Sequence, residues 1–133
     1  MLDELRVPVT SDTDIVNARQ QGRAFAVKIG FNGGDLTLIA TAISELSRNI
    51  VEYARLGEII LSEVQQGNHT GICIIARDDG PGILDVHQAM QDGYSSRRSL
   101  GLGLPGTKRI VDEFEIESHA GKGTIVTVKK WLR

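Results

Sequence analysis

A carboxylate and an amide are spaced to act together in the segment ISELSRNI. Glu45 and Asn49 are four residues apart, so a helix stacks them on one face. At about 100° per residue, this face lies roughly 100° from the centre of the apolar stripe that the same helix offers to a core. The two side chains are therefore expected at the margin of the core, next to whatever covers it. For this pair taken alone, a solvated helix flank is the simpler interpretation.

A second acidic motif, DDGPGI, follows directly after an apolar strand. Asp78 stands at the strand end, where a carboxylate can accept a hydrogen bond from an adenine amino group. Gly80 and Gly82 would then keep side chains away from the ring. Asp-Gly and Pro-Gly are also ordinary turn pairs, so the motif alone is equally compatible with a plain turn.

A glycine-rich run, GLGLPG, opens a helix late in the chain. Free N–H groups and the positive end of a helix dipole attract phosphate at such a place. Gly101, Gly103 and Gly106 have the GxGxxG spacing, but the run follows a non-periodic loop rather than an early strand of a βαβ unit. This excludes a dinucleotide fold of the Rossmann type. No Gly-Lys-Ser/Thr is present, which excludes a Walker loop.

Two further segments could complete a ligand site. Gly121-Lys122-Gly123-Thr124 enters the last strand, where a tight hairpin turn explains it and a Thr124 hydroxyl near adenine is the sharper alternative. Residues 92–103 show no periodicity. Their charged and hydroxyl side chains include Ser95, Ser96, Arg97, Arg98 and Ser99, and solvated arginines are the more frequent meaning of an Arg-Arg pair.

The elements that must position these residues follow from hydrophobic periodicity and turn signals. Helices are predicted at 13–29, 35–55, 85–92 and 104–112. Strands are predicted at 2–10, 58–64, 71–77, 114–120 and 124–131, the first of them at a sheet edge because of Pro8. This order predicts an α+β two-layer sandwich, with helices on one face of a mixed or antiparallel sheet that we take to be mixed.

Composition limits the class of protein. The chain has 133 residues, 41% hydrophobic and 24% charged, which predicts one globular domain over residues 1–133. A net charge of −2 with interleaved signs argues against nucleic-acid binding. No apolar run is long enough for a membrane span, and the amino terminus is acidic where a secretory signal would be basic. With one cysteine, Cys73, the expected location is the cytoplasm.

Taken in order, the four motifs resemble the N, G1, G2 and G3 boxes of the ATPase superfamily of gyrase, Hsp90, histidine kinases and MutL. The nucleotide pocket of this superfamily is the Bergerat fold, and the resemblance covers roughly residues 35 to 128. Within it, the chain is similar to small serine/threonine kinases and anti-sigma factors that control bacterial sigma factors. The segments that carry this likeness are DIVNARQQGRAFA, AISELSRNI, DDGPGI, DGYSS, GLGLPGTKRIVDEF and WLR.

The resemblance implies ATP and Mg²⁺ as cofactors and gives each motif a role. It makes Asn49 the magnesium ligand and Glu45 the general base toward the attacking hydroxyl. It makes Asp78 the acceptor for the adenine amino group, with Thr124 completing the adenine end. The residues that it places around the base and the phosphates are Gly80, Gly82, Ile83, Gly101, Leu102, Gly103 and Gly106. It makes residues 92–103 a mobile lid with charge for phosphate. Phosphoryl transfer would then proceed by positioning and charge neutralisation.

The resemblance also implies a substrate and partners. The substrate would be a serine or threonine on a small STAS-domain antagonist protein of a stressosome-like complex. Phosphorylation would dissolve the complex and release the kinase to bind a downstream regulator such as a phosphatase. An anti-sigma factor with the same pocket and another partner surface is the rival interpretation. A histidine kinase is not expected, because 133 residues leave no room for its helical domain.

Overall fold

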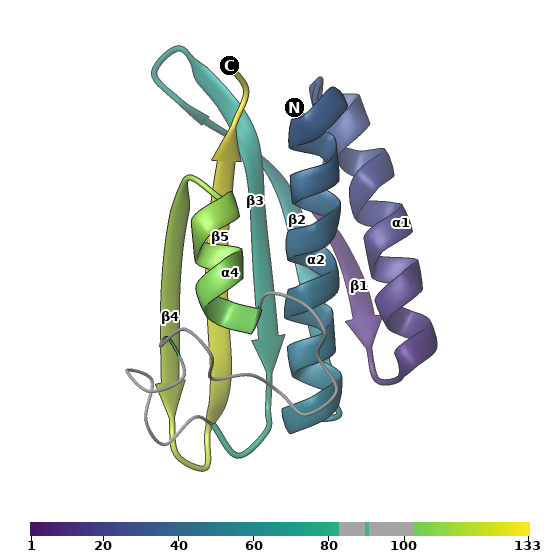
Figure 1. Ribbon diagram of the computed structural model, residues 1–133, viewed down its shortest axis with the longest axis vertical. Coiled ribbons are helices and arrows are strands. Elements are labelled where there is room, and N and C mark those ends of the chain that lie inside the picture. The colour runs from purple at the N-terminus through teal and green to yellow at the C-terminus, as the bar shows by residue number, and fades with distance from the viewer. Residues whose placement is uncertain (83–89, 91–102) are drawn as a thin grey trace.

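Helices cover one face of a twisted sheet in the computed structural model (Figure 1). The structure describes residues 1–82, 90 and 103–133, and in this part of the chain it has three helices and five strands. The predicted α+β two-layer arrangement is confirmed. The predicted helix at 85–92 and most of the predicted lid lie outside the described residues.

The N-terminal part consists of one short strand and one long helix. Strand β1 (Leu5–Val9) lies at an edge of the sheet, as Pro8 predicts, because proline offers no N–H to a second neighbour. Helix α1 (Asp12–Ile29) starts after Ser11 and ends at Gly30, which has a φ of 127° and donates its N–H to two carbonyls of the last turn. A glycine suits this position because residues with a side chain rarely adopt positive φ.

Helix α2 (Gly33–Tyr53) is the longest helix of the described chain. It begins two residues earlier than predicted, because Asn32 is its N-cap and the two glycines that follow belong to the helix. It packs closely on α1, where a Cβ atom added to Gly22 would collide with the side chain of Ile43. Four residues of the predicted apolar stripe are buried, with 0–2% exposure at Ile39, Ile43, Leu46 and Ile50, whereas the fifth, Ala54, is the half-buried C-cap of the helix.

The central hairpin is longer than predicted. Strands β2 (Gly57–Gln66) and β3 (His69–Asp78) pair along ten residues each, and their turn contains Gly67 with a φ of 60°. β3 is buried over Ile72–Ile74 and at Ala76, because it lies in the middle of the sheet under the helices. Its last residue is Asp78, so the acidic motif does begin where this strand ends.

The C-terminal part is a short helix and a second hairpin. Helix α4 (Gly103–Ile110) has eight residues, with Pro105 tolerated in its first turn. Strands β4 (Glu113–His119) and β5 (Gly123–Trp131) follow and pair with each other. α4 packs against α2, so two helices that are distant in the sequence lie side by side above the sheet.

The strand order is β1-β2-β3-β5-β4, and every strand pair in the described residues is antiparallel. The prediction of a mixed sheet is therefore wrong, and its antiparallel alternative is right. β1 and β2 are neighbours that are separated by two helices in the sequence. α1 and α2 form a hairpin of helices, so the chain returns to the end of the sheet that it left and β2 runs back alongside β1 (Figure 1).

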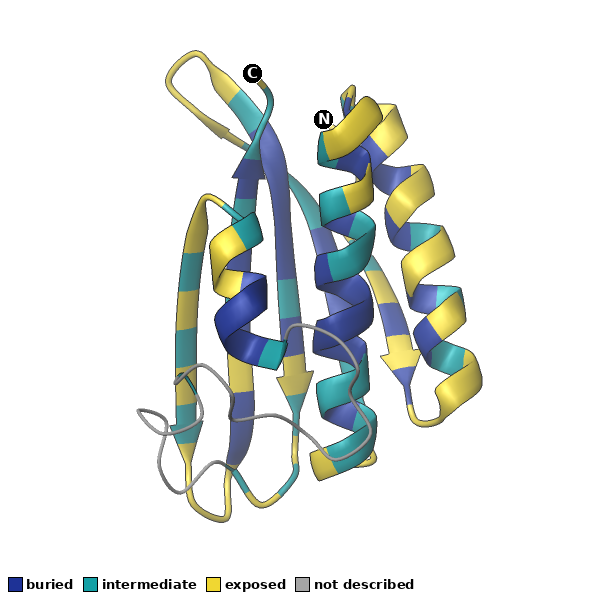
Figure 2. Ribbon diagram, viewed as in Figure 1, coloured by how far each residue is buried: buried dark blue, intermediate teal, exposed yellow. Residues whose placement is uncertain are grey.

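The core fills the space between the helices and the sheet (Figure 2). Alternate residues of each strand face it, including Val7, Ile59, Ile74 and Val128. Cys73 lies on the other face of the sheet and is buried as well, and burial raises the pKa of its thiol. No helix among the described residues is long and apolar enough to span a membrane.

Candidate active site

The predicted site residues that the structure describes gather toward one end of the sandwich. This end contains the C-terminal part of α2, the end of β3, the first turn of α4 and the turn between β4 and β5 (Figure 1). The four motifs come from positions that are up to about 80 residues apart in the sequence, and only the fold brings them together.

Asp78 is fixed at this end by backbone donors. In the sheet it lies opposite Thr124 of β5 and Gly57 of β2. Its Oδ1 accepts hydrogen bonds from the N–H of Gly80 at 3.0 Å and from the N–H of Thr124 at 3.2 Å. Both bonds use Oδ1, so they fix the carboxylate plane while Oδ2 takes part in neither. An exocyclic amino group is a donor that Oδ2 could accept from.

Burial raises the pKa of Asp78 above its ordinary value. The charge of neighbouring Asp79 acts in the same direction, whereas the two backbone hydrogen bonds to the carboxylate oppose the shift. A half-buried carboxylate that keeps its charge against desolvation gains from a ligand that donates a hydrogen bond to it. The direction of this shift therefore fits a binding role, as perturbed carboxylates often do at functional sites.

The glycines of the acidic motif are needed by the protein itself. A Cβ atom at Gly80 would lie 2.5 Å from Cβ of Ala54, the residue that caps α2. Gly82 has a φ of 80°, and a Cβ atom there would collide with the carbonyl of His119 at the end of β4. The sequence predicts that these glycines make room for a base. The structure gives them a second reason, which is that the loop packs against α2 on one side and the β4–β5 turn on the other.

Thr124 lies next to Asp78 and is 6% exposed. Its hydroxyl and that of Ser118 are 2.7 Å apart, and Ser118 also donates to the carbonyl of Gly123 at 3.2 Å. Gly123 has a φ of 92°, and a Cβ atom there would collide with the carbonyl of Asp78. The entry to β5 is thus pressed against the end of β3, which explains why a glycine must precede Thr124.

Glu45 is buried rather than solvated. It is 9% exposed, and its Oε1 accepts a hydrogen bond from Nη1 of Arg48 at 3.0 Å. Asn49 is half-buried one turn further along α2. The interpretation of this face as a solvated flank is therefore wrong for Glu45. A buried carboxylate held by one arginine can serve as a proton acceptor with a defined orientation.

Two residues near this pair were not singled out in the sequence. Arg48 could not be recognised from its type, because arginine is common on helix surfaces and its bond to Glu45 depends on rotamers. Glu52 could have been recognised, since 45, 49 and 52 have the i, i+4, i+7 spacing of one helix face. Its Oε1 is buried without a hydrogen-bond partner in the described part of the chain.

The glycine-rich run is only partly described. Gly103 is the first residue of α4 and has a φ of 63°, and its carbonyl accepts a hydrogen bond from the hydroxyl of Thr107 at 2.8 Å. Gly106 is buried within the same helix. Ile83, Gly101 and Leu102 lie outside the described residues, so their predicted contacts with the nucleotide stay predictions.

The polar residues of α2 lie at increasing distances from Asp78. Gly80 contacts Ala54, and along α2 the rise from Ala54 to Asn49 is about 7.5 Å and to Glu45 about 13.5 Å. An elongated ligand with its base at Asp78 could therefore extend along this face of α2. The described residues contain no cluster of three acidic, histidine or cysteine side chains that could hold a metal ion alone. Mg²⁺ bound together with a nucleotide keeps waters and phosphate oxygens as ligands, so it needs few ligands from the protein. The amide of Asn49 and the buried Oε1 of Glu52 suit this need.

Comparison with known proteins shows the family to which the chain belongs. The model of the histidine kinase-like ATPase domain matches residues 8–130, so the chain belongs to this family. Serine/threonine-protein kinase RsbT of Bacillus subtilis (strain 168) is 48% identical over 133 residues, which are 100% of both chains. At this identity over the full length, the chain is an enzyme of the same kind, a serine/threonine-protein kinase.

A more distant relative and a solved structure are also similar to this chain. An anti-sigma F factor of Thermoanaerobacter sp. (strain X514) is 32% identical over 121 residues, covering 86% of this chain and 83% of that protein. The crystal structure of the RsbU and RsbW domains of a Mycobacterium tuberculosis protein has a TM-score of 0.62 at 22% identity, covering 97% of this chain and 32% of that chain. The structural likeness supports the fold alone.

Proposed function

We propose that this kinase uses Mg-ATP to phosphorylate a serine or threonine on a STAS-domain antagonist protein. Asp78 binds the adenine amino group through Oδ2, and Thr124 completes the adenine end. Asn49 coordinates the metal, and Glu45 accepts the proton of the attacking hydroxyl. Gly80, Gly82 and Ile83 line the base.

The glycine-rich run binds the polyphosphate end of the nucleotide. Gly101, Leu102, Gly103 and Gly106 surround the phosphates at the start of α4. Mg²⁺, when bound, neutralises phosphate charge. The protein supplies orientation and a proton acceptor, which is most of what phosphoryl transfer needs.

One observation carries this proposal above the others. The Asp78 carboxylate is oriented by two backbone N–H groups, and the buried Glu45 stands about nine residues of helix away from the point where this loop touches α2. Asp78 can accept a hydrogen bond from the adenine at one end of the site, and Glu45 can accept a proton at the other end. This separation suits a ligand that is as long as a nucleoside triphosphate.

The identity of the partner protein rests on the relatives. RsbT is 48% identical over its whole length, which supports a partner-switching kinase of the same kind. In such a switch, phosphorylation of the antagonist in the cytoplasm dissolves a stressosome-like complex. The released kinase then binds a downstream regulator such as a phosphatase.

Transfer of label from γ-labelled ATP tests this function. Purified STAS-domain proteins are incubated with Mg-ATP and wild type, Glu45→Ala or Asp78→Asn. We expect label on serine or threonine with wild type alone, while Glu45→Ala still binds Mg-ATP. Normal transfer by Glu45→Ala would remove this residue from the role of general base.

An anti-sigma factor is the second candidate, because a protein of that name is 32% identical to this chain. It would use the same pocket and retain a sigma factor instead of a STAS-domain protein. Both partners are offered in equal amounts to immobilised protein with Mg-ATP or Mg-ADP. Retention of the sigma factor alone, without label on the STAS-domain protein, would favour this candidate.

A further inference from the structure

A buried lysine lies at the end of the sandwich opposite to the candidate active site. Lys130 is the penultimate residue of β5, and its side chain is 6% exposed on the helix-covered face of the sheet. A lysine at this depth requires acceptors, since an isolated buried charge is costly. Its position in the core layer is set by the register, in which it pairs with Ile72.

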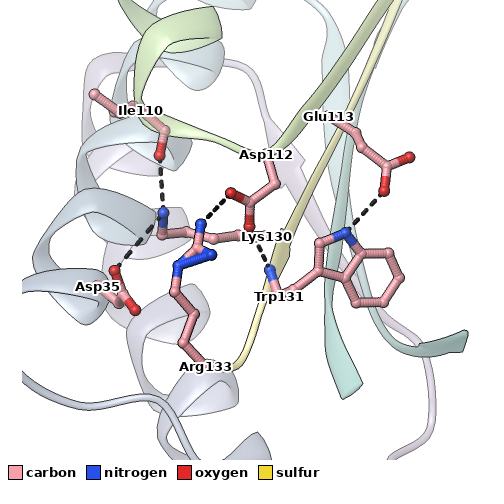
Figure 3. Close-up of polar contacts among 7 residues, drawn as sticks. All are labelled: Asp35, Ile110, Asp112, Glu113, Lys130, Trp131 and Arg133. Atoms are coloured by element: carbon pink, nitrogen blue, oxygen red, sulfur yellow. Dashed lines mark hydrogen bonds and ion pairs between the residues drawn. The ribbon is translucent and has the colours of Figure 1, made fainter. Parts of the chain in front are cut away.

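The ammonium group of Lys130 connects two helix ends (Figure 3). Nζ donates to the carbonyl of Ile110, the last residue of α4, at 3.2 Å. Nζ also lies 3.7 Å from Oδ1 of Asp35 in the first turn of α2. A cation is favourable at a helix C-terminus and an acid at a helix N-terminus, so this arrangement satisfies both helix dipoles.

The turn after α4 is held at the same place. The N–H of Trp131 donates to Oδ2 of Asp112 at 2.8 Å, and Arg133 forms an ion pair with the same carboxylate (Figure 3). The N–H of Asp112 in turn donates to the carbonyl of Lys129 at 2.9 Å. The C-terminal end of α4 is therefore attached to β5 by both side-chain and backbone bonds.

The opposite end of α4 enters the candidate active site. α4 has only eight residues, and a helix this short is not stable by its own hydrogen bonds. Its direction therefore depends on what holds it, and Lys130 is the buried contact at its C-terminus. A change of tilt at that end moves the first turn at Gly103, and a helix N-terminus attracts phosphate through its backbone N–H groups and its dipole.

We propose that Lys130 is a positioning residue that orients α4 for the polyphosphate end of the nucleotide. This inference rests on the proposed function, because it assumes that the first turn of α4 receives phosphates. Lys130 touches no substrate in this proposal and acts through the C-terminal end of α4. The adenine end at Asp78 does not depend on α4. A specific effect of Lys130 should therefore weaken the binding of the phosphates and not that of the adenine, whereas general destabilisation would weaken both.

Nucleotide affinities measured by titration calorimetry test this inference. Mg-ATP and AMP are compared in wild type, Lys130→Met and Lys130→Arg, with Lys129→Met as control because Lys129 faces the other side of the sheet. We expect Lys130→Met to bind Mg-ATP about tenfold more weakly, with AMP affinity unchanged. Lys130→Arg should recover most of the loss, and Lys129→Met should match wild type.

Three results would overturn the inference. Equal weakening of Mg-ATP and AMP would indicate a structural role, and unchanged Mg-ATP affinity would indicate no role. If Lys130→Met does not fold, Lys130→Gln is used, because its shorter side chain keeps a polar group at this position but loses the ammonium group that contacts Ile110. A wild-type ratio of the two affinities in folded Lys130→Gln would then contradict the proposal. Failure of wild type itself to bind Mg-ATP would instead refute the proposed function.

Discussion

The two ends of this sandwich hold their polar groups in different ways. At the end with the β4–β5 turn, the Asp78 carboxylate is held by the backbone N–H groups of Gly80 and Thr124, and glycines let main chains touch. At the other end, Lys130, Asp112 and Arg133 bond to one another's segments through their side chains. The first end also leaves Oε1 of Glu52 buried without a partner in the described chain.

This difference indicates which end is built for a ligand. Side chains that satisfy one another's hydrogen bonds stabilise the fold and leave few donors or acceptors for a ligand. Carboxylates that are oriented by the backbone, and buried oxygens without partners, retain capacity for a bound molecule. Substitutions at the first end should therefore change ligand binding more than stability, except at the glycines. Those at the second end should do the reverse, except at Lys130, which we propose to act on binding through α4.

The largest effect is expected at Gly123, where stability and binding cannot be separated. Alanine there must adopt a φ of 92° and collides with the carbonyl of Asp78, which together should cost about 3–4 kcal/mol in the free energy of unfolding. Gly121→Ala is the matched control. Gly121 has a φ of 77° but nothing within 4 Å of an added Cβ atom, so about 1 kcal/mol is expected. Urea unfolding that gives equal losses for the two variants would contradict the close approach of β3 and β5.

Asp78→Asn should separate binding from stability. Loss of the charged acceptor should weaken Mg-ATP binding by roughly 2–3 kcal/mol, or about 100-fold, as measured by calorimetry. The amide oxygen can still accept from Gly80 and Thr124, so the fold should persist. Full ATP affinity in this variant would refute the assignment of the pocket.

The pKa of Asp78 also gives the sign of the stability effect. Because burial raises this pKa in the folded state, ionised Asp78 lowers the stability of wild type at pH values above its ordinary pKa of 3.8. Asp78→Asn should therefore be as stable as wild type or more stable at pH 7. The contribution of this titration to the difference should disappear at pH values well below 3.8, where the carboxyl is protonated in both states. A less stable variant at pH 7 would contradict the desolvation of this carboxylate.

Arg48→Met should affect phosphate transfer more than stability. Nη1 of Arg48 orients the carboxylate of Glu45, and its loss should slow transfer by about tenfold with little change in ATP affinity. Arg48→Lys should recover part of the rate, because it keeps the charge without the planar guanidinium. Single-turnover transfer with saturating Mg-ATP measures this rate. An unchanged rate for Arg48→Met would mean that the ion pair has no part in orienting Glu45.

The smallest effect is expected at the opposite end. The side chain of Arg133 is 62% exposed, so its pair with Asp112 should contribute less than about 1 kcal/mol to stability. Arg133→Ala should leave Mg-ATP affinity and phosphate transfer unchanged. A clear loss of affinity would show that the two ends are coupled through more than Lys130.

Local sequence signals predicted most of the secondary structure. The apolar stripe of α2, the glycine at the end of α1 and Pro8 in an edge strand each depend on a few neighbouring residues, and each is confirmed. The sequence also singled out Asp78 at a strand end, because the acidic motif directly follows an apolar run. Element ends differ by two or three residues where glycines continue a helix or where a hairpin extends.

Only the tertiary structure decided which of these residues meet. Asp78 and Thr124 are 46 residues apart, and the hydrogen bond between them depends on β3 and β5 being neighbours in an antiparallel sheet. The burial of Glu45 and the contacts of Lys130 likewise depend on the packing of distant elements. By itself, the sequence determined the local elements and the residue types available for chemistry, because periodicity and turn preference act over a few residues. Desolvation and partner choice depend on long-range packing, so the site became specific only in the fold.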